Sequence, residues 1–369
     1  MKYKTVKLKE IADIVMGQSP KSDFYNTDGM GTPFLQGVRT FGDNYPIIDT
    51  YTTLFNREAS AGQILFSVRA PVGRVNWATQ NIAIGRGLAA IKVKSGYSKD
   101  YLYYLFKRIG SRLDSLSTGT VFTSINKKEL EELSLNIPIE LTNQERIANY
   151  LKRLDLKIDL NNQINANLLE LAKTIFEKKY NATKYIPMSK LAEVKDGTHN
   201  SPKQQSIGYP LVTSKAIKGM SIDFSQLKLI SKQDFNKINE RSLVEHGDIL
   251  FSMIGTVGLV YKVIEDPVNY AIKNVGLIKT HESVYSTLIY LSLISSRGHE
   301  YVKSHMSGST QQFLSLTNLR KFPIPDISKA QLYRLNYLLN PIFNEIENLA
   351  HQNRTLNKAK NRLLSKLLN

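Results

Sequence analysis

The side chains that could carry out acid–base or metal chemistry form no recognised catalytic pattern in this sequence. It contains only six histidines and no cysteine, which leaves no thiol nucleophile and no zinc–thiolate site. His199, His246 and His305 stand alone in polar segments, and we expect them on the surface or at helix caps. The HExxH zinc motif, the GxxxxGK phosphate loop and the amino-methyltransferase NPPY and DPPY motifs are all absent. We therefore predict no catalytic residue and no metal site.

Two acidic patterns and two glycine-rich stretches resemble a nuclease or a cofactor site at first sight. Pro325-Asp326 and Asp155-Leu156-Lys157 fit a nuclease PD…DxK pattern, but they fall at opposite ends of a predicted coiled-coil unit. Gly85-Arg86-Gly87 and Gly255 to Gly258 lie inside β-like repeats, where glycines usually serve bulges or close packing. We expect no cofactor to bind this chain.

Loops rich in hydrogen-bonding side chains are the remaining candidates for function. Sequence readout on DNA needs Arg, Lys, Asn, Gln, Ser or Thr on rigid loops, with basic side chains on the phosphates. The candidates in the first part of the chain are Lys21, Ser22, Arg39, Arg69, Arg74, Arg86, Thr118 and Thr120. Those in the second part are Thr198, Lys203, Ser214, Lys215, Thr256, Lys273, Asn274, Gln311 and Gln312. The alternative is that these loops vary because nothing constrains them.

The two sets of loops belong to a unit that occurs twice. Gly62 to Val75 (GQILFSVRAPVGRV) and Gly247 to Val260 (GDILFSMIGTVGLV) are identical at eight of fourteen positions, which indicates a duplication. Lys9 to Ile14 and Lys190 to Val194 each predict a short helix that leads into a glycine turn. Strands are predicted at Gly31 to Leu35, Gly208 to Val212, Ala83 to Lys92 and Ala271 to Lys279, and helices at Lys99 to Leu116 and Tyr285 to His305. Glycines recur at matching positions in the two copies, whereas the loop side chains differ. This difference is expected if the two copies recognise different DNA sequences.

A long helix is predicted after each copy. Thr142 to Tyr180 contains neither Gly nor Pro, and its apolar residues recur in alternating steps of four and three, as in a heptad repeat. A second seam starts at Leu335, and residue i of the first seam matches residue i + 188 of the second. The proposed spacer and docking residues are Ile147, Leu151, Leu154, Ile158, Asn165, Leu168, Leu335, Leu339, Ile346, Asn353 and Leu356.

Matched seams predict that the two helices pack against each other. Because each helix leaves its domain in the same sense, a two-fold arrangement makes the pair antiparallel, with rods of roughly 55 to 60 Å. Asn165 and Asn353 would set the register, while a solvated bend at Asn161 and Asn165 is the alternative. Another alternative is that each stripe only caps its neighbouring domain. Pro341 should cause a kink or a fresh helix start.

The overall charge points to an anionic partner. The formal net charge is +17, of which the two helical segments account for +2 and +5, so most of it lies on the domains. Such self-repulsion is better tolerated when the partner is a polyanion such as nucleic acid, although excess lysine also keeps proteins soluble. The 42% hydrophobic content favours a globular protein. No signal-like start or long apolar run occurs, so we expect a cytoplasmic protein.

Together these features resemble the specificity (S) subunit of Type I restriction-modification enzymes. The resemblance covers essentially the whole chain and rests on KEIADIVMGQSP, GQILFS…VG, GDILFS…VG, the STGT…SIN loop and IP…NQERIANYLKRLDLKID. It implies two target-recognition domains that each read half of a bipartite site in double-stranded DNA. It also implies an antiparallel helical spacer that docks two methyltransferase subunits, which restriction subunits join. By carry-over, Gln144 to Asp159 and Gln331 to Glu347 would form the docking surface, the second less securely because it lacks the NQERI wording.

We therefore expect an α+β chain made of duplicated domains and long helices. Its expected parts are domains at 1–141 and 183–327 and spacer helices at 142–182 and 328–369. The resemblance implies a non-catalytic subunit whose partner uses S-adenosylmethionine to methylate adenine. The rival hypothesis is a two-domain scaffold that binds proteins, without specific DNA recognition.

Overall fold

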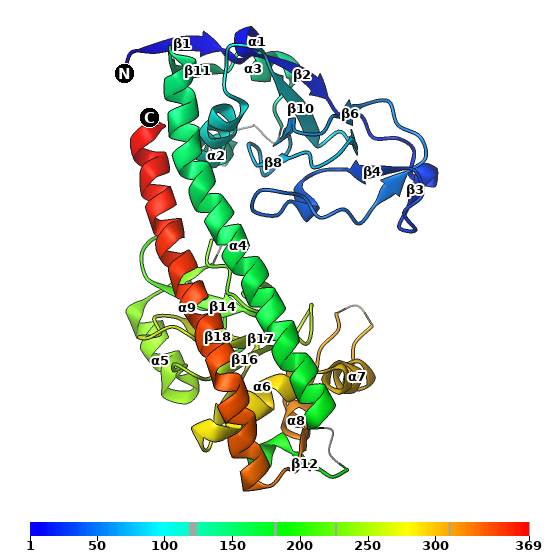
Figure 1. The fold of residues 1–369 in the computed structure, drawn as a ribbon, viewed down its shortest axis with the longest axis vertical. Coiled ribbons are helices and arrows are strands. Elements are labelled where there is room, and N and C mark those ends of the chain that lie inside the picture. The colour runs from blue at the N-terminus through cyan, green and yellow to red at the C-terminus, as the bar shows by residue number, and fades with distance from the viewer. Residues whose placement is uncertain (118–123, 181–182, 226, 310, 369) are drawn as a thin grey trace. The chain divides into compact units, whose positions relative to one another are not determined.

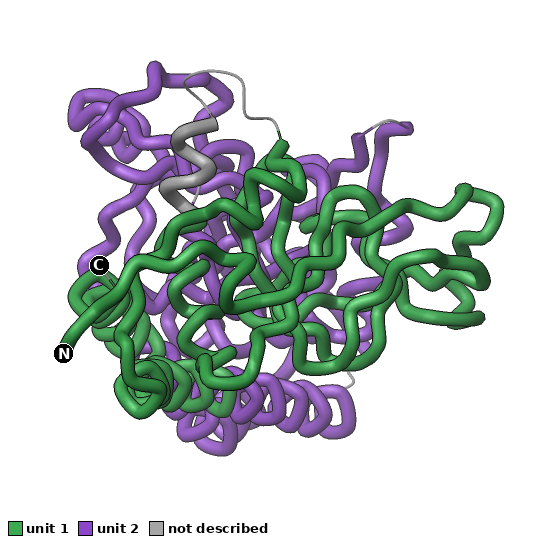
Figure 2. Tube along the Cα trace, turned by 90° about the horizontal axis from the view of Figure 1, so that it is seen from above, with its two compact units in different colours: residues 1–160, 352–369 green, residues 161–351 purple. Residues whose placement is uncertain are grey.

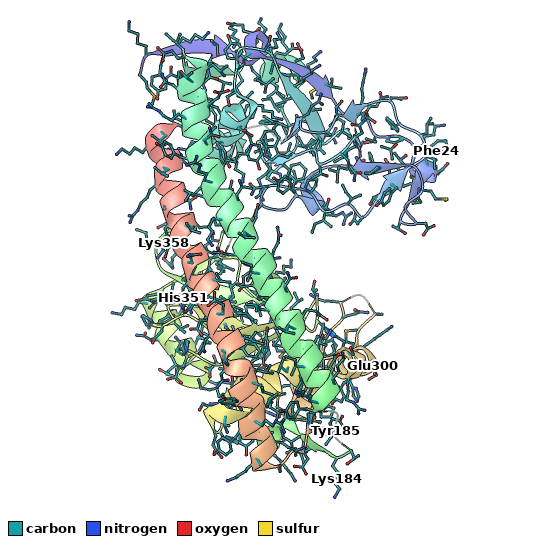
Figure 3. The ribbon with its side chains drawn as sticks, viewed as in Figure 1. Phe24, Lys184, Tyr185, Glu300, His351 and Lys358 are labelled. Atoms are coloured by element: carbon teal, nitrogen blue, oxygen red, sulfur yellow. The ribbon has the colours of Figure 1, made fainter. Side chains whose placement is uncertain are left out.

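The computed structural model describes residues 1–117, 124–180, 183–225, 227–309 and 311–368, with the backbone alone for 111–117. The chain divides into unit 1, residues 1–160 and 352–369, and unit 2, residues 161–351 (Figure 2). The division runs through both long helices, α4 (Leu141–Lys179) and α9 (Lys329–Leu367). Each unit therefore holds one globular domain and one part of each long helix. Within the described ranges, no helix combines the length and apolar character that crossing a membrane requires.

The domain of unit 1 contains three sheets. Strands β1 (Tyr3–Lys7) and β11 (Ser134–Pro138) form an antiparallel pair. The central sheet has the order β2-β10-β7-β8, with β2 (Ala12–Met16), β10 (Leu88–Val93), β7 (Ile64–Ser67) and β8 (Val75–Trp77). The outer sheet has the order β3-β5-β4-β9-β6, with β3 (Tyr25–Asn26), β5 (Tyr51–Thr52), β4 (Thr32–Leu35), β9 (Ile82–Ile84) and β6 (Glu58–Ala59). The helices are α1 (Leu8–Ile11), α2 (Lys99–Ser117) and α3 (Lys127–Glu131).

The domain of unit 2 repeats this topology. Strands β12 (Tyr185–Pro187) and β20 (Pro323–Pro325) pair as β1 and β11 do. The order β13-β19-β16-β17, with β13 (Ala192–Asp196), β19 (Val275–Thr280), β16 (Ile249–Ser252) and β17 (Val260–Lys262), repeats the central sheet. The outer sheet, β15-β14-β18, has β15 (Leu229–Ile230), β14 (Tyr209–Thr213) and β18 (Ala271–Lys273). The helices are α5 (Lys232–Ser242), α6 (Ser286–Ile294), α7 (Ser296–His305) and α8 (Leu316–Arg320). The α+β class and the duplication are thus confirmed.

Two local expectations from the sequence are met only in part. The short helix expected near residue 9 is α1, but it leads into strand β2 and not directly into a glycine turn, because alternate residues such as Ala12 and Ile14 are buried. The helix expected at 190–194 is wrong, since most of that segment lies in strand β13. The helical stretch from 285 to 305 is two helices, since the Ser295 hydroxyl caps α7 by accepting from the Gly298 N–H.

The long helices pack antiparallel within each unit (Figure 1). In unit 1 the start of α4, with Ile147 and Leu151, shares a core with Leu363 and Leu367 near the end of α9. In unit 2 the end of α4, with Ala172 and Phe176, shares a core with Leu332, Leu335, Leu339 and Phe343 near the start of α9. These cores also include domain strands, so the seam residues join the helices to each other and to their domain.

Pro341 lies inside α9, which is assigned as one continuous helix. The fresh helix start expected there is therefore not observed. Pro341 is exposed, and the buried residues Leu339 and Phe343 hold the opposite face of the helix against the core. Only the one backbone hydrogen bond that proline cannot donate is lost, on a face where water can replace it.

Candidate nucleic-acid interface

In unit 1 the loop after β2 lies against the turn between β9 and β10. The Gly17 N–H donates to the Leu88 carbonyl (2.8 Å) and the Gln18 N–H donates to the Ile84 carbonyl (2.9 Å). A Cβ on Gly17 would lie 2.2 Å from the Gly85 carbonyl oxygen, so the close approach requires glycine here. Backbone hydrogen bonds and a close backbone contact therefore hold this junction without help from side chains.

Polar side chains converge on this junction. The Ser19 hydroxyl accepts from the Arg86 N–H (3.1 Å) and from the Gln36 amide (2.8 Å). The Tyr25 hydroxyl donates to the Pro20 carbonyl (2.9 Å). Partial burial raises the pKa of Tyr25, and the nearby Arg86 charge opposes that shift. The exposed Arg86 side chain thus projects from a turn whose backbone is held by neighbouring side chains.

Unit 2 builds the same junction from different side chains. The Gly197 N–H donates to the Val275 carbonyl and the Thr198 N–H donates to the Ile272 carbonyl, both at 3.0 Å. Two residues, Lys273 and Asn274, lie between the accepting residues Ile272 and Val275, whereas three residues lie between Ile84 and Leu88 in unit 1. The shorter connection is closed by Asn274 in the left-handed region, with φ of 52°.

His199 lies in the centre of the second junction. Its Nε2 lies 2.7 Å from Asp196 Oδ2 and its Nδ1 lies 2.8 Å from Asn274 Oδ1. Arg241 pairs with the other oxygen of Asp196, and Lys273 reaches the Ser201 hydroxyl. His199 is exposed, as expected, but it is held at the junction by Asp196 and Asn274 and so is not isolated. Its position two residues after Gly197 matches Ser19 after Gly17, a signal present in the sequence alignment.

A second loop follows the ILFS strand in each unit and has the same frame. The Ser67 hydroxyl donates to the Pro71 carbonyl (2.7 Å) and accepts from the Arg74 N–H (2.8 Å). The Ser252 hydroxyl does the same with the Thr256 carbonyl (2.7 Å) and the Leu259 N–H (2.8 Å). Both serines are fully buried, so they hold the loops and leave other residues exposed.

Each second loop contacts the polar segment that was aligned with it in the sequence. Arg69 forms an antiparallel bridge with Ser124, and Ile254 forms one with Phe313. The Gly255 N–H donates to the Gln312 carbonyl (3.0 Å). The structure therefore brings the loop that contains Thr256 against Gln312 from a distant part of the sequence. Thr118 and Thr120 fall outside the described residues.

The remaining DNA-binding candidates differ in how exposed their side chains are. Exposed side chains are Lys21, Ser22, Arg39, Arg69, Arg74, Arg86, Lys203, Lys215, Thr256, Gln311 and Gln312, whereas Thr198, Lys273 and Asn274 are half-buried. Arg39 pairs with Asp49 at 2.7 Å. Ser214 is buried, and its hydroxyl donates to the Asn274 carbonyl (3.0 Å), so it supports the turn and is not placed to touch a base.

The proposed spacer residues lie along the helix pair. Ile147, Leu151, Ile158, Asn165, Leu335, Leu339 and Asn353 are buried, whereas Leu154, Leu168, Ile346 and Leu356 are half-buried. In unit 2 the Asn165 amide donates to the Ile346 carbonyl (3.2 Å), and in unit 1 the Asn353 amide donates to the Ile158 carbonyl (3.4 Å). Adding 188 turns Ile158 into Ile346 and Asn165 into Asn353, so the two bonds are equivalent under the repeat.

A buried ion pair joins the helices in unit 1. Lys360 Nζ lies 2.7 Å from Asp155 Oδ1, and the Tyr104 hydroxyl donates to Asp155 Oδ2 (2.8 Å). Burial raises the pKa of Tyr104, and the Asp155 charge raises it further. The equivalent positions in unit 2 are Ala172 and Phe343, and both are buried in an apolar core. The two units therefore pack their helices at equivalent positions, one with an ion pair and the other with apolar side chains.

In the parts of the chain that the structure describes, no group of three or more His, Asp or Glu could hold a metal ion. The loop junctions instead present exposed donors on a backbone that neighbouring groups hold fixed. Such an arrangement suits recognition of hydrogen-bonding surfaces.

Comparisons with known proteins agree with this arrangement. A family model described as type I restriction modification DNA specificity domain matches residues 1–170 and 184–331. The putative type I restriction enzyme MjaX specificity subunit of Methanocaldococcus jannaschii is 43% identical over 148 residues, which cover 40% of this chain and 35% of that protein. The type I restriction enzyme MjaIX specificity subunit of the same organism is 24% identical over 408 residues, covering 98% of this chain and 91% of that protein. The crystal structure of the type I restriction-modification S subunit from M. genitalium is similar in fold, with a TM-score of 0.54 and 17% identity, covering 100% of this chain and 96% of that chain.

Proposed function

The chain belongs to the type I restriction-modification DNA specificity family, and from this premise we propose that it selects the DNA target of such a complex. Each domain reads one half of a bipartite site in double-stranded DNA. The two long helices hold the domains apart and dock the catalytic subunits. The matched segment of the first relative covers only 35% of that protein, so activity and partners are proposed from the site itself.

One observation carries the proposal, namely that two junctions with the same backbone frame present different side chains. Gly17 and Gly197 make equivalent hydrogen bonds, yet Ser19 and Arg86 occupy the first junction while His199 and Lys273 occupy the second. A fixed frame with exchanged donors is what two readers of different sequences require. The positive net charge of +17 supplies the attraction to phosphates.

Catalysis belongs to the partners in this proposal. We propose that two methyltransferase subunits bind S-adenosylmethionine and methylate adenine, and that restriction subunits join them to cut DNA. This chain would then bind no cofactor of its own. It would act by bringing the target within reach of those subunits.

The long helices carry large apolar side chains that are mostly exposed. Tyr150 and Leu156 on α4 are 55% and 54% exposed, and Tyr333 and Tyr337 on α9 are 63% and 82% exposed. Exposed aromatic residues of this kind mark protein contacts. They lie within Gln144–Asp159 and Gln331–Glu347, the segments proposed to dock the methyltransferase subunits.

The test uses the assembled complex with its methyltransferase and libraries of duplexes with randomised half-sites. Arg86→Gln should relax base preference in one half-site and Lys273→Gln in the other, each at a cost of about 1–3 kcal/mol. Lys128→Gln, on the exposed part of α3, is the matched control and should change neither preference.

Two results would count against the proposal. A complex that binds random and target duplexes equally at moderate salt would leave no sequence readout. Binding unaffected by salt, together with intact assembly of the subunits, would favour the protein-binding scaffold instead.

A further inference from the structure

A short hairpin follows strand β4 in unit 1 and strand β14 in unit 2. In unit 1 Phe41 pairs with Pro46, and the Gly42 N–H donates to the Tyr45 carbonyl (3.0 Å). In unit 2 Ile217 pairs with Ile222, and the Lys218 N–H donates to the Ser221 carbonyl (2.9 Å). These hairpins share little sequence, so the equivalence emerges from the structure. Asn44 and Met220 occupy the same place at the two tips.

Asn44 joins its domain to a long helix in unit 1. Its carbonyl accepts from the Trp77 N–H (2.9 Å), and its Oδ1 accepts from Lys107 Nζ (2.5 Å) and the Tyr103 hydroxyl (3.1 Å). Burial raises the pKa of Asp159 on α4, and a hydrogen bond from the Asn44 side chain opposes that shift. Asn44 is only 7% exposed, so the Asn44 side of these bonds is shielded from bulk water.

Met220 occupies the same place in unit 2 with an apolar side chain. It lines a small cavity of about 40 Å³ together with Leu169 of α4 and Phe343, Ile346 and Glu347 of α9. Lys262, also in this lining, lies over the Phe343 ring at 5.3 Å from its centroid. Burial lowers the pKa of Lys262, and the Glu347 charge opposes that shift.

The two tips meet equivalent positions of the two helices. Adding 188 turns Asp159 into Glu347, so each hairpin reaches the same helical position from its own domain. In unit 1 the link is a hydrogen bond from Asn44 to Asp159, whereas in unit 2 Met220 and Glu347 line the same small cavity. The contact is present in both units although its chemistry differs, so what the two units share is the place where each hairpin meets its helix.

We propose that Asn44 and Met220 are positioning residues that fix the orientation of each reading domain on the spacer helices. This inference rests on the proposed bipartite recognition and adds to it. The hairpins do not read bases. They set where each reading surface stands along the DNA, and so they restrict the complex to one distance between half-sites.

The test measures binding of the methyltransferase complex to duplexes whose gap between half-sites varies one base pair at a time. Asn44→Ala removes the bonds to Lys107, Tyr103 and Asp159, and each lost hydrogen bond corresponds to about a fivefold effect. Only the bond to Asp159 links the hairpin to the helix, so we expect the preference for the native gap over its neighbours to fall about fivefold, with both half-sites unchanged. Tyr45→Ala, at the exposed neighbouring position, is the matched control.

A second variant acts from the helix side and guards against simple loss of folding. Asp159→Leu should relax the gap preference as Asn44→Ala does, and the double variant should add little to either, because the two side chains share one contact. Unfolding is monitored on the same samples.

Three outcomes would overturn the inference while leaving the proposed function standing. They are an unchanged gap preference in both folded variants, a changed base preference within a half-site, and additive effects of the two substitutions. Loss of all sequence preference in the unaltered complex would instead remove the proposed function itself.

Discussion

Replacing Lys360 with methionine should strongly destabilise unit 1. The side chains of Lys360 and Asp155 are only 14% and 8% exposed, so the substitution leaves a carboxylate buried without its counter-charge. Breaking a buried pair in this way typically costs about 3–5 kcal/mol. Asp155 would retain the Tyr104 hydroxyl at 2.8 Å, which places the expected loss near the lower value, about 3 kcal/mol. For a unit of this size that corresponds to a fall of about 6–12 °C in the melting temperature.

The double variant Asp155→Leu, Lys360→Met separates charge burial from packing. Apolar residues should fill both positions without an unpaired charge, as Phe343 and Ala172 do in unit 2, so its melting temperature should return close to that of the original chain. Lys358→Met, at an exposed position of the same helix, should change stability by less than about 0.5 kcal/mol. Differential scanning calorimetry measures all three variants. Equal melting temperatures for Lys360→Met and the original chain, or a double variant worse than the single one, would refute the reasoning.

Three further predictions concern pH, the spacer and the junction glycines. Burial lowers the pKa of Lys107 from 10.5 to about 8 in the folded protein. Between these pH values the unfolded chain binds the extra proton, so the free energy of unfolding should rise as pH rises from 8 towards 10.5 and fall as pH drops back through 8. Urea titrations should show this rise, and Lys107→Met should abolish it. Inserting seven residues into both long helices adds about 10 Å and should lengthen the unread gap by roughly three base pairs, as methylation mapping would show, whereas an altered half-site would contradict the spacer role. Gly17→Ala places a Cβ 2.2 Å from the Gly85 oxygen and Gly197→Ala places one 2.3 Å from the Ile272 oxygen, so each should impair binding to its own half-site alone in the duplex libraries.

Periodicity and repetition in the sequence were sufficient to define the architecture. The ILFS segments, the framework glycines and the seam residues are local patterns, and their physical requirements act at fixed spacing along the chain. They predicted two copies of one domain, two long helices and the alignment of Asn165 with Asn353. The bonds of these asparagines to Ile346 and Ile158 follow that alignment.

Contacts between distant segments were decided only by the tertiary structure. His199 is close in sequence to Asp196, but Asn274, which holds the other ring nitrogen, comes from a distant turn whose length differs between the copies. The equivalence of Asn44 and Met220 is not visible in the sequence, because a polar side chain occupies the hairpin tip in one unit and an apolar side chain occupies it in the other. The sequence predicts a kink or a fresh helix start at Pro341, because the lost hydrogen bond is local, but no fresh start occurs because the buried face of the helix holds it against the core. Position along the chain determines which segments repeat, whereas side-chain chemistry at a tertiary contact is free to change as long as the fit between the surfaces is kept.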